Sequence, residues 1–290
     1  GRVPSGLFVL TAGRGDSAVG TLVSFVQQVS IDPPCVAVAM RPEMTPTLAR
    51  MAAAQERAYK KPFKWFSIPQ LFRYEKQQKG RKREHFQLNC DILGETDRAA
   101  DAELIALLID TLRALGLTSA DFVVRLSSRN AWADFFASRC SDAAKAYDFF
   151  QVVDKLERMR PEESAALLAP LGFQLAEVQD FIARSEPSAE LQHILDQLTA
   201  RGLREFVRVD YGVIRGLAYY TGPVFEAFDV KGEFRAICGG GRYDQLVRQV
   251  SGGKVDLPAL GFGMGDVVLL ELLKARGLLP RSEERRVGKE

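Results

Sequence analysis

Residues 72–87 form the most informative segment of this 290-residue chain and read Phe72-Arg-Tyr-Glu-Lys-Gln-Gln-Lys-Gly-Arg-Lys-Arg-Glu-His-Phe-Gln87. The stretches 65–75 and 86–93 are rich in β-forming residues, and a polar, basic run from Lys76 to Glu84 separates them. The pattern predicts two antiparallel strands joined by a long basic loop.

Positive charge gathers around this loop. Residues 60–85 hold nine lysines and arginines against two glutamates, although the whole chain carries a net charge of only +2. The same segment contains the aromatic residues Phe63, Trp65, Phe66, Phe72 and Tyr74. This mixture indicates contact with the phosphates of a nucleotide or a nucleic acid, and a solvated basic loop is the simpler alternative.

The composition excludes several classes of protein. With 47% hydrophobic and 26% charged residues, the chain is long enough for about two globular domains. No apolar run reaches the ~18 residues of a membrane-spanning helix, and the first residues lack the pattern of a secretion signal. Four cysteines without a CxxC pair and only two histidines predict neither disulfides nor a metal site. We therefore expect a cytoplasmic protein that makes no contact with a membrane.

Outward from residues 72–87, the predicted elements change in character along the chain. Residues 7–40 alternate apolar runs with turn signals, which predicts short strands and a boundary near residue 40. The later elements are helices at 48–58 and 101–116, a strand at 122–126, a helical stretch at 130–204, strands at 207–211, 224–230 and 234–238, and a helix at 266–275. This order predicts an α+β domain around a mostly antiparallel sheet, with a helical module inserted into it.

Two glycine runs, Gly239-Gly-Gly241 and Gly261-Phe-Gly-Met-Gly265, accompany the last predicted elements. Neither run matches the phosphate-binding loop of P-loop proteins or the dinucleotide-binding GxGxxG pattern. They adjoin two polar clusters, Arg215-Gly-Leu-Ala-Tyr-Tyr-Thr-Gly222 and Gly239-Gly-Gly-Arg-Tyr-Asp244. We therefore expect glycine at these positions to allow the close approach of a ligand.

Four segments, in the same order, resemble the histidyl-tRNA synthetase family of class II aminoacyl-tRNA synthetases. Residues 72–87 resemble motif 2 of that class, and the other matches are Arg41-Pro-Glu-Met-Thr-Pro-Thr47, residues 215–222 and residues 239–244. The resemblance covers about residues 41–275 and implies the class II fold, an antiparallel sheet flanked by helices. It assigns residues 41–125 and 206–278 to the catalytic core and residues 126–205 to a helical insertion.

The resemblance implies that ATP, with Mg²⁺, activates histidine to histidyl-adenylate, which is then transferred to tRNA(His). A carboxylate that attacks the α-phosphate crowds negative charge, and arginines spread that charge. By resemblance, Arg73 and Arg215 are the catalytic residues and bind the α-phosphate, Arg81 reaches the outer phosphates, and Glu75 belongs to the ATP site. An ordinary surface or ion-paired arginine is the alternative for each of the three arginines.

Six residues resemble the histidine-binding residues of the family. Glu43, Thr45 and Gln87 correspond to the ligands of the ammonium group, and the imidazole partners are Asp91, Tyr219 and Tyr220. A purely structural role is the alternative for Tyr219. A pocket that pairs a polar side chain rejects analogues without it by ~10⁴ to 10⁵, so no editing site is expected.

Two positions depart from the family pattern. Asp91 stands where many members have glutamate, which is one methylene longer, so a water molecule is expected to bridge to the imidazole. Val268 stands where the family's last motif commonly supplies an arginine that stacks on adenine. The valine implies either weaker ATP binding or a subgroup that manages without this arginine.

The two ends do not follow the family. Residues 1–40 lack motif 1, which builds the family's dimer interface, and about residues 6–40 instead resemble a fragment of a flavin reductase-like domain. Residues 279–290 form a polar tail, and no anticodon-binding domain is recognised. A fused or truncated reading frame is therefore one expectation, and a homodimer is expected if another segment replaces motif 1. The alternative function is a catalytically silent, histidine-binding paralogue that resembles the regulatory subunit of ATP phosphoribosyltransferase.

Overall fold

The computed structural model describes the backbone of residues 8–12, 19–23, 25–31, 34–39, 41–73, 82–184, 186–215 and 219–279. Side chains are described from Arg41 onward. Within these ranges, no helix is long and apolar enough to cross a bilayer.

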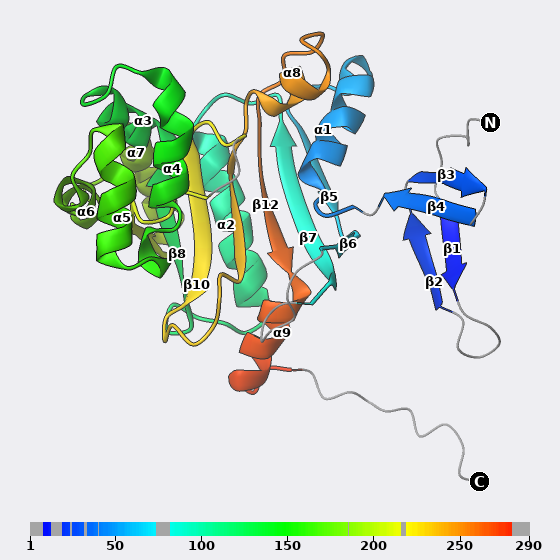
Figure 1. Ribbon diagram of the computed structural model, residues 1–290. Coiled ribbons are helices and arrows are strands. Elements are labelled where there is room, and N and C mark those ends of the chain that lie inside the picture. The colour runs from blue at the N-terminus through cyan, green and yellow to red at the C-terminus, as the bar shows by residue number, and fades with distance from the viewer. Residues whose placement is uncertain are drawn as a thin grey trace.

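An eight-stranded sheet is the centre of the fold (Figure 1). Its strands run in the order β5 (Phe63–Ser67), β7 (Glu84–Leu93), β12 (Ala259–Gly265), β11 (Cys238–Arg242), β10 (Pro223–Asp229), β8 (Phe122–Ser128) and β9 (Val207–Val209). The short strand β6 (Gln70–Phe72) also pairs with β7. Every pairing is antiparallel except that of β8 with β9. The predicted α+β fold, with its class II antiparallel sheet flanked by helices, is confirmed.

Helices α2 (Ala99–Ala114) and α9 (Asp266–Ala275) pack on one face of this sheet, and Figure 1 shows α2 crossing behind the strands. The apolar side of α2 is buried against Phe262 and Met264 of β12 in the main core. A second core lies between α1 (Thr45–Ala54), α8 (Leu246–Val250) and the upper ends of the strands in Figure 1. The sheet is therefore covered on one face and capped at one end.

Five helices follow β8 and form the module drawn in green in Figure 1: α3 (Arg129–Ala137), α4 (Ala146–Val153), α5 (Pro161–Leu168), α6 (Leu175–Ala183) and α7 (Ala189–Ala200). Ser128 is the last residue of β8, and its side chain caps α3 by accepting a hydrogen bond from the Ala131 amide at 3.1 Å. The aromatic rings of Trp132, Phe135, Phe149 and Phe173 pack together inside the module. Its apolar interior is continuous with the main core.

The segment before α1 forms two small antiparallel sheets, β1 (Phe8–Ala12) with β2 (Val19–Val23) and β3 (Phe25–Ile31) with β4 (Pro34–Ala39). Both are drawn beside the main sheet in Figure 1 and are separate from its hydrogen-bonding order. The expectation of short strands in residues 7–40 is therefore confirmed, whereas residues 280–290 of the polar tail lie outside the described ranges.

The strand predicted at 234–238 is wrong in its position. The observed strand β11 begins at Cys238 and runs through the three glycines to Arg242. It lies between β10 and β12, where a Cβ at Gly240 would come within 2.3 Å of the Gly261 carbonyl oxygen. Glycine is poor in β propensity, but here it alone fits the close approach of three backbones.

Candidate active site

Alternation along the strands places the predicted site residues on the face of the sheet that α2 does not cover. One row across the strands holds Asp91, Gly261, Gly241 and Val224, which are paired in register. The next row holds Asn89, Gly263, Gly239 and Glu226. Because side chains two residues apart share a face, the glycines form a floor without side chains in the middle of the sheet.

The glycine floor leaves room for three side chains that the sequence analysis singled out. A Cβ at Gly239 would lie 1.4 Å from Arg215 Nη1, and one at Gly261 would lie 2.0 Å from Asp91 Oδ1. A Cβ at Gly263 would lie 2.3 Å from Gln87 Nε2. The groups that approach these glycines are side chains of the chain itself, and the expected approach of a ligand stays a prediction.

Arg215 lies at the centre of this face. Its Nη1 pairs with Glu226 Oε1 at 3.0 Å, and its guanidinium carbon lies 5.3 Å from the centre of the Tyr220 ring. Burial alone would lower the arginine's pKa, but the neighbouring Tyr220 and Glu226 raise it overall, so the side chain stays charged. Its Nε is buried without a hydrogen-bond partner among the described residues. A charged donor with unused capacity suits an anionic ligand.

The backbone of Arg215 is also unusual. Its φ angle of 57° is in the left-handed region, and no other non-glycine residue in the described ranges shares this property. Such a conformation costs about 1–3 kcal/mol and persists where the surroundings hold it in place. Here the ion pair with Glu226 and the glycine floor determine where the side chain lies.

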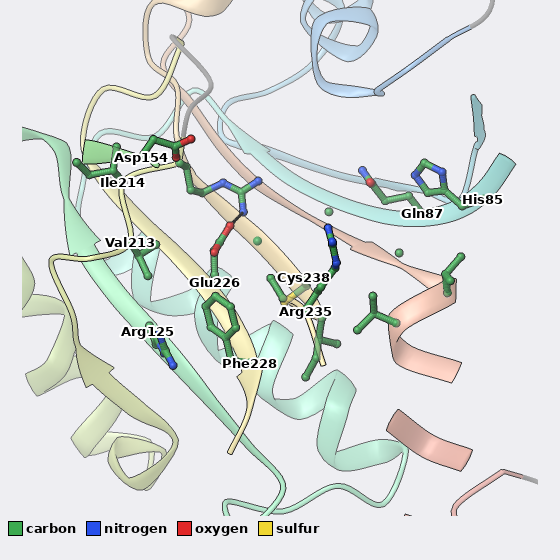
Figure 2. Close-up of a pocket in the computed structure, with 18 of the residues that line it drawn as sticks. His85, Gln87, Arg125, Asp154, Val213, Ile214, Glu226, Phe228, Arg235 and Cys238 are labelled. Atoms are coloured by element: carbon green, nitrogen blue, oxygen red, sulfur yellow. Dashed lines mark hydrogen bonds and ion pairs between the residues drawn. The ribbon is translucent and has the colours of Figure 1, made fainter. Parts of the chain in front are cut away.

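A cleft of about 740 Å³ opens over the floor, and Figure 2 shows part of its lining. The lining as a whole is predominantly basic. Its charged lining consists of two acidic residues, Asp154 and Glu226, and of the basic residues Arg73, Lys82, Arg125, Arg158, Arg215 and Arg235. In Figure 2, Glu226 and Arg125 lie on one side of the cleft, and Gln87 and His85 lie on the other. The excess of positive charge favours a polyanionic ligand.

Arg73 connects the cleft to the segment that carries Glu43 and Thr45. Its Nε donates a hydrogen bond to the Pro42 carbonyl oxygen at 2.8 Å, and the neighbouring Phe72 amide donates to the Arg41 carbonyl oxygen at 2.8 Å. Glu43 lies next to this contact, and Thr45 is the first residue of α1. Arg73 therefore lines the cleft and also positions two of the predicted histidine ligands.

The predicted imidazole partners meet in a tyrosine cluster beside the cleft. Tyr243 donates a hydrogen bond to Asp91 Oδ1 at 2.6 Å, and its ring centre lies 6.0 Å from that of Tyr219. The Tyr219 and Tyr220 ring centres are 4.9 Å apart. Burial raises the pKa of Asp91 to about 7, and the hydrogen bond from Tyr243 partly opposes this shift. The carboxyl group therefore titrates near neutral pH.

The predicted ammonium ligands border the same cluster. Burial raises the pKa of Tyr219, and Tyr220 and Glu43 raise it further, whereas a hydrogen bond with Thr45 opposes the shift. These interactions place Glu43 and Thr45 beside the Tyr219 hydroxyl. Gln87 comes from β7, lines the cleft, and donates from Nε2 to Asn89 Oδ1 at 2.9 Å. Asp91 and Gln87 thus lie on the same open face of β7, with Tyr219 and Tyr220 clustered near Asp91 and with Gln87 nearer the end of β12.

Two of the predicted ATP residues, Glu75 and Arg81, lie outside the described residues, which omit 74–81. Their predicted roles stay predictions. The structure adds residues that the sequence analysis did not single out, namely Tyr243, Glu226 and Arg235. The sequence holds a signal for two of them. Tyr243 belongs to the polar cluster at residues 239–244, and Glu226 is a charged residue within the predicted strand 224–230, on the same strand face as Val224. Arg235 carried no signal beyond its charge.

Arg242, in contrast, is structural. Its buried guanidinium pairs with buried Asp101 of α2 at 2.5 Å and donates to the carbonyl oxygens of Glu95 and Asp97 at 2.7 and 3.1 Å. This ion pair ties the end of β11 to the start of α2 and so fixes the glycine floor against the covered face.

Known proteins are similar to this chain in both sequence and fold. The sequence profile of the family described as histidyl-tRNA synthetase matches residues 26–266. A histidine–tRNA ligase of Opitutus terrae is 43% identical over 288 residues, which cover 92% of this chain and 64% of that protein. A chloroplastic/mitochondrial histidine–tRNA ligase of Arabidopsis thaliana is 38% identical over 84% of this chain and 53% of that protein. The chain thus spans less than two thirds of the length of either relative.

Two solved structures show the same fold. The crystal structure of histidyl-tRNA synthetase from Nostoc sp. PCC 7120 matches with a TM-score of 0.70 and 21% identity, over 94% of this chain and 64% of that one. An ATP phosphoribosyltransferase regulatory subunit/histidyl-tRNA synthetase from Bacillus halodurans C matches with a TM-score of 0.64 and 23% identity, over 94% and 69%. Because the profile covers most of the residues that build the sheet and the cleft, the chain belongs to the histidyl-tRNA synthetase family.

Proposed function

We propose that the chain is the catalytic core of a histidine–tRNA ligase, which activates histidine with ATP and transfers it to tRNA(His). One observation carries the proposal: the predicted histidine ligands and a basic cleft lie on the same open face, with Arg215 at the junction. A histidine carboxylate in the tyrosine cluster would therefore meet the phosphates of a nucleotide in the cleft.

The chemistry assigned to this junction is the attack of a histidine carboxylate oxygen on the α-phosphorus of ATP, with pyrophosphate as the leaving group. Both reactants are anionic, and further negative charge develops on the phosphoryl oxygens as the new bond forms. Arg215 and Arg73 stabilise that charge. Glu226 holds the Arg215 guanidinium over Gly239, so the donor is oriented before the reaction begins.

Histidine recognition uses two sets of hydrogen bonds. Glu43, Thr45 and Gln87 bind the ammonium group, and Asp91 binds the imidazole next to Tyr219 and Tyr220. Burial raises the pKa of the Asp91 carboxyl group. An apolar side chain of the same size would give this buried carboxyl no hydrogen bond, which favours imidazole.

The Mg²⁺ in this proposal accompanies ATP as part of the substrate. The carboxylates that line the cleft are Asp154 and Glu226, and Glu226 is paired with Arg215. No group of three or more potential ligands is found in the described residues. Mg²⁺ commonly binds through substrate phosphates and one or two carboxylates, and this lining fits that mode. We also propose that the chain binds tRNA(His), forms a homodimer and acts in the cytoplasm.

The test is the histidine-dependent exchange of labelled pyrophosphate into ATP. The purified chain should catalyse this exchange with histidine and with no other standard amino acid. Comparable exchange with another amino acid would contradict the assignment of the substrate.

The alternative is a histidine-binding paralogue without catalysis. The neighbour from Bacillus halodurans C, which has the same fold, is described by both functions, so the fold alone does not separate them. The presence of Arg73 and Arg215 at the cleft favours the enzyme. Histidine binding by calorimetry together with no detectable exchange would favour the paralogue instead.

A further inference from the structure

We propose that Arg235 determines the affinity for ATP by providing the cationic face of the site for the adenine base. This inference rests on the proposed function. The resemblance places an arginine of the last motif at adenine, but this chain has Val268 at that position, in the first turn of α9. The structure offers Arg235, from a different element, on the lining of the same cleft.

Arg235 and the start of α9 line the same cleft. Strand β11 pairs with β12 so that Cys238 is opposite Met264, and the pairing is antiparallel. The loop before β11 and the start of α9 therefore leave the same end of the paired strands, and both line the cleft there. Gly265 ends β12 and precedes α9, whose first residues are Asp266 and Val267. Arg235 therefore reaches the cleft beside the helix turn that carries Val268.

The loop that carries Arg235 is anchored at its base. Arg276, at the end of α9, pairs with Asp229 at 2.5 Å and with Glu233 at 3.4 Å. The Glu233 amide donates to Asp229 Oδ2 at 2.8 Å. The Ile237 amide then donates to the Ala227 carbonyl oxygen at 2.8 Å. Hydrogen bonds on both sides of Arg235 thus fix where its side chain begins.

The apolar neighbours of Arg235 orient it further. Phe234 packs against the main core, and Ile237 is buried in it. Arg235 lies between these two anchored residues, and its side chain is exposed. Figure 2 shows the side chain extending from the Cys238 side of the cleft toward the side that carries Gln87 and His85.

The surroundings suit a flat aromatic base. Gly263 and Gly265 form the floor of this part of the cleft, and Val267 and Val268 provide apolar lining. A Cβ at Gly265 would lie 3.9 Å from His85 Cδ2, so the imidazole ring borders the same floor. A planar guanidinium stacks on a base through cation–π attraction, and an imidazole ring stacks as well. Arg73 and Arg215 remain available for the phosphates.

The test separates contact with the base from contact with the phosphates. Calorimetry on the full chain would measure the affinity of Arg235→Ala for ATP, for adenosine and for inorganic tripolyphosphate. We expect the affinities for ATP and adenosine to fall about tenfold and that for tripolyphosphate to change by less than about twofold. Histidine affinity should not change. In the exchange assay, KM for ATP should rise and kcat should be kept.

Two further variants serve as rescue and control. In Arg235→Ala/Val268→Arg the cation moves to the helix turn, and affinity for ATP should recover by at least about threefold over Arg235→Ala. Arg248→Ala removes an equal charge from α8, where the side chain is 57% exposed and pairs with Asp256, so it should leave ATP affinity unchanged.

Every outcome decides the proposal. An equal loss of tripolyphosphate affinity in Arg235→Ala would assign Arg235 to the phosphates and overturn the inference, as would unchanged ATP affinity. A double variant no better than Arg235→Ala would overturn the idea that Arg235 replaces an α9 cation. If the unmodified chain bound no ATP at all, the proposed function would fail as well, which distinguishes that failure from one of Arg235 alone.

Discussion

The two faces of the main sheet are made by alternate residues of the same strands, yet they have opposite compositions. The covered face presents Phe262 on β12, Phe225 on β10 and Leu126 on β8, all of them fully buried under the helices. The open face presents glycines on β11 and β12, with Glu226 on β10 and Arg125 on β8. Neighbouring residues of one strand thus differ by a whole aromatic ring in size.

The contrast separates two physical tasks. Burial of apolar area on the covered face supplies the free energy of folding, at about 25 cal/mol for each Å² removed from water. The open face gives up such burial for room and charge, and it keeps Arg215 in a strained backbone conformation. Substitutions on the covered face should therefore change stability, and substitutions on the open face should change binding and catalysis.

The largest expected effect lies on the covered face. Phe262→Ala would remove a ring that is 2% exposed and leave a cavity between β12 and α2, so the free energy of unfolding should fall by about 3–5 kcal/mol. Urea denaturation would measure this loss. The exchange rate per folded molecule should stay within about threefold. A Phe262→Ala protein of normal stability would show that the two faces do not divide the tasks in this way.

Next in size is the loss of the arginine at the centre of the open face. Arg215→Ala removes charge that stabilises the reacting phosphorus, so the turnover of pyrophosphate exchange should fall by ~10² to 10³. Histidine affinity, measured by calorimetry, should change little, and the free energy of unfolding should not fall by as much as in Phe262→Ala. A parallel loss of histidine affinity would instead make Arg215 a substrate-binding residue.

The covered face was also the easier one to predict from sequence. The apolar spacing of residues 101–116 predicts the helix observed as α2, and the helix predicted at 266–275 is confirmed as α9 with the same bounds. Such patterns follow from local periodicity. The strand through Gly239 and Gly240 was misplaced because β propensity disfavours glycine, and only the register with both neighbouring strands reveals why glycine is needed there.

The candidate site was recognised through resemblance, because no local pattern joins its parts. Asp91 and its hydrogen-bond partner Tyr243 are 152 residues apart in sequence, and they meet because β7 and β11 flank β12. The motifs led to Asp91, Arg73 and Arg215. They did not lead to Arg235, whose place in the cleft depends on a loop anchored by Arg276.

A third prediction concerns Asp91, a carboxyl group on the open face that is nevertheless buried. Its pKa is raised from about 4 to about 7 by burial, so between these values the folded chain keeps a proton that the unfolded chain has released. The stability contributed by the protonated group is present below pH 4 and is lost as pH rises through 7. Asp91→Asn does not titrate, so its stability relative to the unmodified chain should rise by up to about 1.4 kcal/mol per pH unit in this window.

Denaturation at half-unit steps from pH 4.5 to 7.5, without ligands, would measure this slope. Tyr243→Phe is the matched variant, because it keeps the ring and removes the hydrogen bond that lowers the pKa of Asp91. In Tyr243→Phe the window should extend to higher pH. A pH-independent difference between Asp91→Asn and the unmodified chain would mean that Asp91 is already ionised in the folded protein.

The smallest effect is expected for Gly263→Ala. Gly263 directly follows Phe262 in β12 and faces the open side of the sheet, so the two substitutions compare the two faces at adjacent residues. A methyl group at Gly263 would collide with Gln87 Nε2, which is the far end of a flexible side chain, so the amide shifts and the backbone stays in place. Gly263→Ala should therefore change the free energy of unfolding by less than about 1 kcal/mol, since the lower entropy of the unfolded chain offsets part of the cost. Displacement of Gln87 breaks its 2.9 Å hydrogen bond to Asn89 and moves a predicted ligand of the histidine ammonium group, so histidine affinity should fall about fivefold. Gly222→Ala is the control, because its methyl group would meet no atom closer than 3.5 Å, and histidine affinity should be unchanged in it. Two results would contradict this prediction: a loss of stability in Gly263→Ala as large as that in Phe262→Ala, or a histidine affinity in Gly263→Ala equal to that of Gly222→Ala. Either result would show that neighbouring residues of β12 do not divide folding and binding between the two faces.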